Sequence, residues 1–155
     1  MSNEKKLPLR NFLEKNISKY FPVFIDKKIF ENIEDVNRFL NNDFLSELND
    51  KEFMEISIHG NKDENGYFED DTVLMILKNK TKSMCTFFNS IEDQIGYTSF
   101  NKNGKKGVYE EFILSNGQRD KYEDIYLVDN EEIKNIILSY CINRTCSKSI
   151  LWEKW

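Results

Sequence analysis

The sequence is poor in the residues that mark several large classes of protein. Its 155 residues include only two prolines, six glycines, three cysteines and one histidine. No Pro/Ser-rich linker, internal repeat or low-complexity tract is present, so we expect one domain over residues 1–155, with a helix and an extended segment over 1–30 and a core over 31–155. Three cysteines, an odd number, at ordinary spacing indicate reduced thiols rather than a disulfide scaffold, which favours a cytoplasmic protein.

Long apolar runs are also missing. The longest, Val73–Leu77, has five residues, whereas a helix that crosses a bilayer needs about 20. Residues 1–10 contain no uninterrupted apolar stretch behind their charges. The pattern therefore predicts neither a secretory signal nor a membrane partner.

Acidic side chains outnumber basic ones, 27 to 22, and the formal net charge is −5. This balance argues against a general phosphate-backbone binder, so we expect no direct nucleic-acid partner. Residues 31–71 hold most of the imbalance, with thirteen acidic and three basic side chains. Twelve Phe and seven Tyr in a chain that is 39% apolar exclude disorder as the main state.

Helical periodicity occurs in three segments. The first is predicted to end near Tyr20, and the second to extend from an N-cap at Asn32 to Leu48. Asp129 and Glu132 form a capping-box pattern ahead of the last helix. The predicted buried stripe of that helix consists of Ile133, Ile136, Ile137, Tyr140 and Cys141.

Between the second and third helices the apolar period changes from 3.6 residues to two. Met54, Ile56 and Ile58 alternate with polar residues, which predicts a strand with one wet face. The run Val73–Leu77 is apolar on both alternating faces and predicts a central strand that is covered on each side. Further extended segments or strands are predicted at 23–25, 83–89, 95–101, 108–114, near 119, at 125–128 and at 149–152.

Short polar connections between these strands imply antiparallel neighbours. Asn116–Gly117 predicts a type I′ hairpin turn, and the cluster Lys102–Gly107 a solvated hairpin turn. Because the strands come in runs rather than in alternation with helices, we expect an α+β fold: a twisted, mainly antiparallel sheet of about five to seven strands packed by about two or three helices.

The sequence contains none of the common enzymatic motifs. GxGxxG, Walker A, GxSxG and HExxH patterns are absent, and no catalytic residue, metal or cofactor is predicted. His59 has no adjacent Ser or Cys nucleophile, so an exposed or hydrogen-bonded structural histidine is favoured over a small hydrolase that uses it. Cys141 and Cys146 match neither a CxxC pair nor a zinc knuckle, and we expect Cys141 to be a buried, inert thiol.

Residues 61–72 match the first half of an EF-hand calcium loop, with oxygen donors at alternate positions and Gly66 at the sixth. The twelfth position is Thr72 instead of a bidentate glutamate, and strands rather than helices are expected on both sides. An acidic connection between strands is therefore the favoured interpretation. A ligand- or calcium-responsive binding module stays open as an alternative function.

The order of segments in the last two thirds of the chain resembles that of a known family. These segments are Thr72–Leu77, a following hairpin, Tyr109–Gly117, Ile125–Asp129, the capped helix to Arg144 and Ser149–Glu153. They are similar to the first-numbered immunity protein family of bacterial polymorphic toxin systems, which include contact-dependent growth inhibition systems. The resemblance covers about residues 34–155 and is most specific toward the end, where a terminal Trp–acid pair follows the helix.

The resemblance implies a non-enzymatic inhibitor that binds the C-terminal domain of a cognate toxin and blocks its active site or substrate path. Such toxins are commonly nucleases or nucleic-acid deaminases, whose clefts are positive, so an acidic inhibitor can mimic their substrate. The acidic block also offers aromatic anchors. The toxin-facing set that we expect consists of Asp63, Glu64, Tyr67, Phe68, Glu69, Asp70 and Asp71.

Two alternatives concern individual aromatic residues. Tyr67 and Phe68 could instead cover the sheet while the neighbouring acidic side chains are merely solvated. Trp152, which follows Leu151 on the last predicted strand, is expected to pack in the core.

Overall fold

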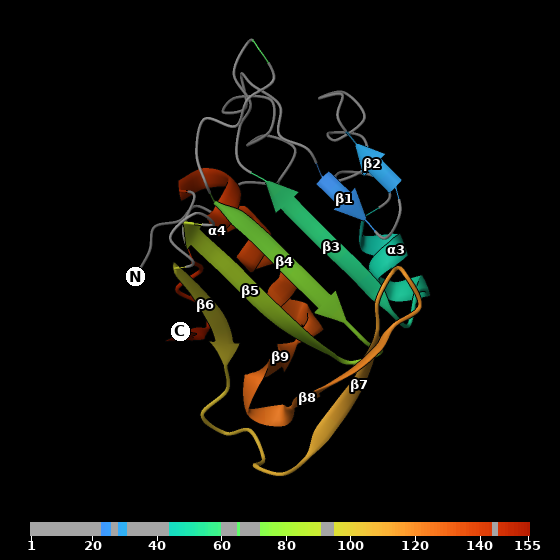
Figure 1. Ribbon diagram of the computed structural model, residues 1–155, viewed down its shortest axis with the longest axis vertical. Helices are drawn as coiled ribbons and strands as arrows, with labels where there is room; N and C mark the ends of the chain where they lie inside the picture. Colours follow the sequence, from blue (N-terminus) through green and yellow to red (C-terminus); the bar gives the residue numbers. More distant parts are fainter. Residues whose placement is uncertain are drawn as a thin grey trace.

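The computed structural model describes residues 23–25, 28–30, 44–59, 65, 72–90, 95–143 and 146–155. These residues form an α+β fold, which confirms the predicted class (Figure 1). The strands are β1 (Val23–Ile25), β2 (Lys28–Phe30), β3 (Met54–His59), β4 (Val73–Lys78), β5 (Lys82–Ser90), β6 (Ile95–Phe100), β7 (Tyr109–Ile113), β8 (Arg119–Glu123), β9 (Leu127–Asp129) and β10 (Leu151–Lys154). The helices are α3 (Phe44–Asp50), α4 (Ile133–Asn143) and the 3-10 turns η2 (Asp124–Tyr126) and η3 (Asn130–Glu132).

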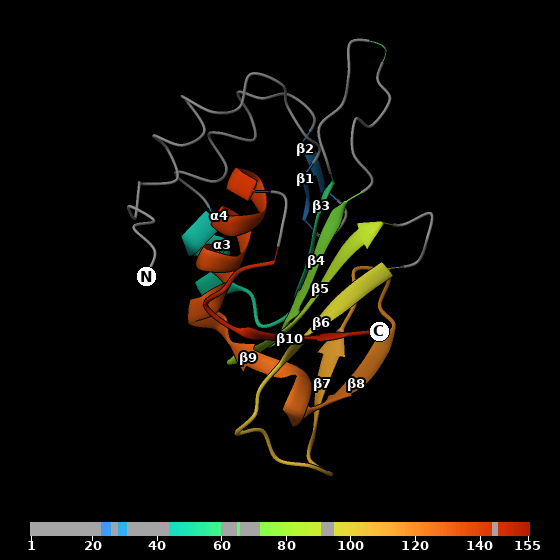
Figure 2. The same cartoon turned by 90° about the vertical axis from the view of Figure 1, so that its left-hand side faces the viewer.

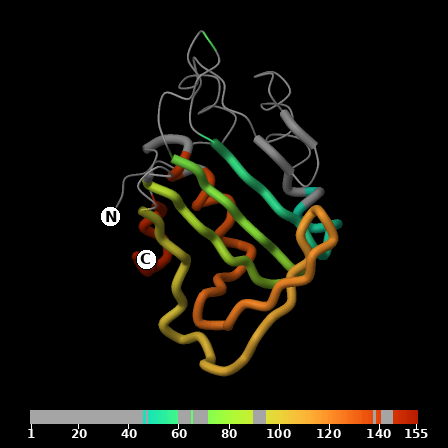
Figure 3. Tube along the Cα trace, viewed as in Figure 1, coloured from blue at the N-terminus to red at the C-terminus, as the bar shows by residue number. Residues whose placement is uncertain are grey.

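Eight of the described strands form one main sheet. Its order is β10-β6-β5-β4-β3-β1-β2, with β9 paired to β5, and every pairing is antiparallel. The strands β3 to β6 follow one another both in sequence and in space. The short connections between β4 and β5 and between β5 and β6 join antiparallel neighbours, as predicted, whereas residues 60–72 separate β3 from β4. The strands β7 and β8 form a separate two-stranded sheet, which lies across one end of the main sheet (Figures 1 and 3).

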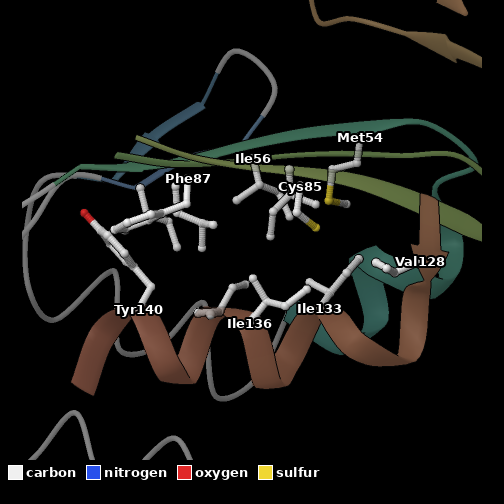
Figure 4. Packing of buried hydrophobic residues seen from close by; sticks show 12 residues of the cluster. Met54, Ile56, Cys85, Phe87, Val128, Ile133, Ile136 and Tyr140 are labelled. Atoms are coloured by element: carbon white, nitrogen blue, oxygen red, sulfur yellow. The ribbon is translucent and has the colours of Figure 1, made fainter. Parts of the chain in front are cut away.

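Helix α4 covers one face of the main sheet (Figure 2). The alternation in β3 places Met54, Ile56 and Ile58 on this covered face, where each is at most 1% exposed. The predicted central position of β4 is confirmed, and its apolar run is buried on both faces except at Met75, which is half-exposed on the face away from α4. Figure 4 shows the side chains of α4 and of the sheet meeting in this core.

The buried stripe predicted for the last helix is confirmed for the residues whose side chains are described. Ile133, Ile136, Ile137 and Tyr140 are all at most 1% exposed and pack against the sheet. The Tyr140 hydroxyl donates to the carbonyl oxygen of Thr72 at 3.2 Å and lies 3.0 Å from the Thr72 hydroxyl. Because the buried phenol has hydrogen-bond partners, its position fixes α4 relative to the start of β4.

Strand β5 shares one edge between two neighbours. Its first part pairs with β9 and its second part with β6. Between these pairings the backbone N–H of Cys85 donates to the Ser99 hydroxyl at 3.0 Å, and that hydroxyl donates to the carbonyl oxygen of Tyr126 at 2.7 Å. The fully buried Ser99 therefore satisfies backbone groups at the point where one ladder is replaced by the other.

The β7–β8 hairpin packs on the opposite face of the main sheet from α4. Phe112 of β7 is fully buried and forms a second small core with Leu77 and Leu127. Asn79, in the turn between β4 and β5, donates through its side-chain amide to the carbonyl oxygen of Glu111 at 3.3 Å. The Glu55 carboxylate accepts hydrogen bonds from the backbone and the hydroxyl of Ser115, each at 2.9 Å. Side chains thus attach the hairpin to the sheet.

Three local predictions were wrong in detail. The turn at Asn116–Gly117 is not type I′: the N–H of Gly117 bonds to the carbonyl oxygen of Leu114, and the N–H of Leu114 to that of Gln118. This is the pattern of a three-residue loop closed by a glycine in the left-handed region, and Gly117 has φ 89°. The register of the hairpin, Ile113 opposite Arg119, leaves too many residues for a two-residue turn.

The other two errors concern a cap and a connection. Asp129 precedes η3 without a side-chain capping bond. The neighbouring Asn130 instead donates through its side-chain amide to the turn between β4 and β5. The cluster Lys102–Gly107 does not join a hairpin, since it links β6 of the main sheet to β7 of the small one. The first predicted helix, and residues 32–43 of the second, lie outside the described residues; α3 is the described end of the second.

Candidate partner-binding surface

The face of the main sheet opposite α4 is only partly covered. Strand register places one residue from each of five adjacent strands in a row across it: Ser57, Met75, Thr86, Thr98 and Glu153. All five retain solvent exposure. Because side chains alternate along strands, this row points away from the core that α4 covers. We call this part of the sheet the open face; in Figure 2 it lies on the side away from the helices.

The next row of the open face ends in an aromatic cluster. His59, Val73, Phe88 and Gly96 lie opposite one another on β3 to β6, and the backbone N–H of Trp155 donates to the carbonyl oxygen of Gly96 at 3.0 Å. The rings of Trp155 and Phe88 are perpendicular, with centroids 4.9 Å apart. The indole Nε1–H donates to the Thr98 hydroxyl at 2.8 Å. Trp155 is therefore held in place, although 57% of it is exposed.

Gly96 is required by the position of this indole. A Cβ at Gly96 would lie 2.9 Å from each of three ring atoms of Trp155, closer than real contacts allow. Since the three consecutive ring atoms are equally distant, the ring covers Gly96 with its face rather than its edge. A glycine inside a strand thus marks a close approach between β6 and an aromatic side chain.

Strand β10 divides its residues between the two faces of the sheet. Trp152 is half-buried against the main core, and its Nε1–H donates to the carbonyl oxygen of Ser147 at 2.8 Å, in agreement with the prediction for this residue. Leu151, Glu153 and Trp155 point to the open face, and Leu151 is 51% exposed. In the part of the chain that the structure describes, the carboxylate of Glu153 has no hydrogen-bond or ion-pair partner.

The toxin-facing residues predicted from the sequence lie between β3 and β4. All seven, Asp63, Glu64, Tyr67, Phe68, Glu69, Asp70 and Asp71, are outside the described residues. Their predicted role stays a prediction. The same holds for most of the segment with EF-hand spacing, of which only Asn65 and Thr72 are described.

The described histidine and cysteine side chains are hydrogen-bonded or at least partly buried. The Nε2 atom of His59 lies 3.2 Å from the Ser57 hydroxyl, so the expected hydrogen-bonded histidine is observed. Burial raises the pKa of the Cys85 thiol, with a smaller contribution from the Glu132 carboxylate, and burial raises the pKa of Cys146 to about 12. Neither described cysteine is a thiolate nucleophile at neutral pH. Among the described residues, no cluster of His, Cys, Asp and Glu could hold a metal ion.

A shallow depression lies beside the start of α4. Its volume is about 240 Å³, smaller than the roughly 300–1,000 Å³ typical of small-molecule sites. Its lining residues come from the end of β6 and the connection after it, from β9 and η3, and from the start of β10 with the residue before it: Phe100, Asn101, Lys102, Asn103, Val128, Asp129, Glu132, Ile150 and Leu151. Size and openness suit contact with a surface better than enclosure of a ligand.

No protein-family model matches the chain, and no curated protein matches it. Of the helices that the structure describes, none combines the length and apolar character needed to cross a membrane.

Trp155 and Glu153 were not among the partner-binding residues predicted from the sequence. A signal was present: residues 151–155 alternate, so once Trp152 is predicted to face the core, Glu153 and Trp155 must face the other way. The isolated Gly96 inside a strand pattern was the complementary signal. Their meeting could not be predicted, because it depends on the pairing of β10 with β6.

Proposed function

We propose that this protein is an immunity protein that acts in the bacterial cytoplasm. It binds the C-terminal domain of a cognate toxin, a nuclease or nucleic-acid deaminase, and neutralises it by occluding the active site or the substrate cleft. It acts by binding and not by catalysis. The class of partner comes from the family resemblance of residues 34–155, and the open face supplies a surface suited to a protein.

The observation that carries this proposal is the exposed but fixed indole of Trp155. Protein interfaces draw most of their affinity from a few anchors, in which Trp, Tyr and Arg are enriched. An anchor whose position is set before binding loses little conformational freedom when the partner arrives. Trp155 meets this condition through its contacts with Gly96, Phe88 and Thr98, and Leu151 adds exposed apolar area on the same strand.

Charge supports a partner with a basic surface. The chain has a net charge of −5, and a toxin that cleaves or deaminates nucleic acid needs a positive cleft to attract phosphates. Opposite potentials accelerate association and discriminate against unrelated partners. Of the seven predicted toxin-facing residues between β3 and β4 in the sequence, five are acidic and would add to this attraction. Reversing the charges of Asp63, Glu69 and Asp70 is expected to slow association with the toxin and to flatten its dependence on salt.

The proposal is tested by co-expression. The toxic C-terminal domain of a large secreted protein encoded by the adjacent reading frame is produced in cells with and without this protein. We expect growth to be restored only when both are present, and the two proteins to co-purify as a complex. Survival that never improves with the adjacent effector, together with no complex between the purified proteins, would refute the proposal.

A matched pair of variants locates the contact. Trp155→Ala is expected to weaken the complex by about 30-fold or more, because a buried interface tryptophan is typically worth at least ~2 kcal/mol. Tyr109→Ala removes an aromatic side chain of nearly equal exposure, 58% against 57%, from the small sheet, and is expected to leave the affinity unchanged. A complex that Trp155→Ala leaves as strong as Tyr109→Ala does, with both at the wild-type affinity, would remove Trp155 and the open face around it from the interface.

A further inference from the structure

We infer that Trp155 and Glu153 together form a recognition site for an arginine side chain of the protein partner. The inference takes the identity of that partner, a toxin domain, from the proposed function. The chemistry of the site comes from the position of the two side chains on β10.

The indole of Trp155 has one face that is free of contacts with β6. One face of the ring covers Gly96, as the equal distances of 2.9 Å from the Cβ position to three ring atoms require. Trp155 as a whole residue nevertheless remains 57% exposed. The exposed area must then include the opposite face, because a flat ring has only two faces. The structure holds this second face toward solvent as a rigid platform, since Phe88 and Thr98 fix the ring in its plane.

The indole face and the Glu153 carboxylate both attract positive charge. The face of an indole carries negative electrostatic potential and attracts cations. Glu153 is two residues from Trp155 on the same side of the strand, so the two backbone positions are about 6.6 Å apart. Glu153 lies opposite Thr98, the residue to which the indole Nε1–H is bonded, so the two side chains project from neighbouring positions on the open face. The exposed Glu153 carboxylate has no partner within the described residues.

This pair of side chains fits an arginine guanidinium better than a lysine ammonium group. A guanidinium is planar, so it can stack on the indole while its edge donates hydrogen bonds to the carboxylate; an ammonium group can do only one of these well. No described basic side chain competes on this side of β10. Lys154 points to the other face of the sheet, and Lys82 is paired with Asp124. The site therefore complements a positively charged partner that presents arginine.

The test uses the full chain and a probe of defined chemistry. Short immobilised peptides with randomised flanking residues and a central arginine, lysine, citrulline or glutamine are incubated with the purified protein. We expect arginine-centred peptides to retain about fivefold more protein than citrulline-centred ones, with lysine in between. Citrulline is the matched control, because it keeps the planar shape and loses the charge.

Three variants sharpen the result. Glu153→Gln, a conservative change of an exposed side chain, is expected to reduce the arginine preference by about threefold. Trp155→Ala is expected to abolish it. Glu131→Gln, which changes an exposed carboxylate on η3, should leave it unchanged. Equal retention of the arginine and citrulline peptides, or a preference that survives both Glu153→Gln and Trp155→Ala, would overturn the inference.

The inference and the proposed function fail separately. If cells are protected from the toxin but Glu153→Gln and Trp155→Ala protect as well as the wild type, the arginine site is refuted and the immunity function stands. If the arginine preference depends on both residues but the protein never protects cells, the immunity function is refuted and the site stands.

Discussion

The fit between Gly96 and the Trp155 indole can be tested by one methyl group. Gly96→Ala adds a Cβ that would lie 2.9 Å from three atoms of the ring, with the backbone of β6 opposing any retreat. The φ angle of Gly96 is not in the left-handed region, so alanine meets no backbone strain. We therefore expect the destabilising part of the effect to arise from displacement of Trp155.

The expected magnitude follows from the contacts that the displaced ring loses. The hydrogen bond from Nε1–H to Thr98 contributes about 0.5–1.5 kcal/mol and the edge-to-face contact with Phe88 a similar amount. Replacing glycine by alanine at a compatible position raises the free energy of unfolding by about 0.4–1 kcal/mol, because alanine restricts the unfolded chain. Gly96→Ala should thus lower the free energy of unfolding by about 1–2 kcal/mol.

A double-mutant cycle isolates this cause. Urea unfolding is measured for the wild type, Gly96→Ala, Trp155→Ala and the double variant, with Trp152 as the fluorescent reporter in all four. Without the indole, the added methyl group meets no obstacle, so Gly96→Ala should be neutral or slightly stabilising in the Trp155→Ala background. The same loss of stability in both backgrounds would refute the assignment of the indole to Gly96.

Three further predictions concern buried groups. Ser99→Ala leaves the Cys85 N–H without its acceptor and should lower the free energy of unfolding by about 2–4 kcal/mol in urea titrations. A decrease of less than about 0.5 kcal/mol, the size expected for a surface substitution, would contradict the bridging role of Ser99. The hydrogen bond from Lys82 holds the pKa of Asp124 below its ordinary value, so the contribution of this carboxylate to stability is present above about pH 4 and is lost as the pH falls further. Asp124→Asn should therefore cost about 1–3 kcal/mol at neutral pH and make the acid limb of the stability curve shallower, and an unchanged limb would count against the pair. Peptide mapping after brief iodoacetamide treatment should find Cys85 unlabelled and Cys146 labelled slowly, because burial keeps both thiols protonated; rapid labelling of Cys85 in the folded protein would show that the core is open.

Features that depend on local periodicity could be predicted from the sequence. The doubly apolar run Val73–Leu77 identified the central strand, and the alternation from Met54 identified a strand with one buried face. The stripe at Ile133, Ile136 and Tyr140 identified the face of α4 that packs on the sheet. In each case the burial of apolar side chains determines the structure, and the spacing of those side chains along the sequence shows which of them are buried.

Features that depend on contacts between distant segments could not be predicted in this way. Asp129 matches a capping residue, but the neighbouring Asn130 makes the contacts, because its amide donates to the turn between β4 and β5 and its oxygen accepts from Ser83. The open face has the same origin. Trp155 and Gly96 are far apart in sequence, and only the antiparallel pairing of β10 with β6 brings them together.

The β7–β8 hairpin has a consequence for how the molecule can change. Its strands share no backbone ladder with the eight-stranded sheet, and in the described residues it is attached through Phe112, Asn79 and Glu55. A longer tip at Asn116 and Gly117, beyond the contacts that Leu114 and Ser115 make with the sheet, therefore shifts no register elsewhere. This exposed turn is a graft point, where a foreign loop can be inserted while the rest of the domain keeps its arrangement.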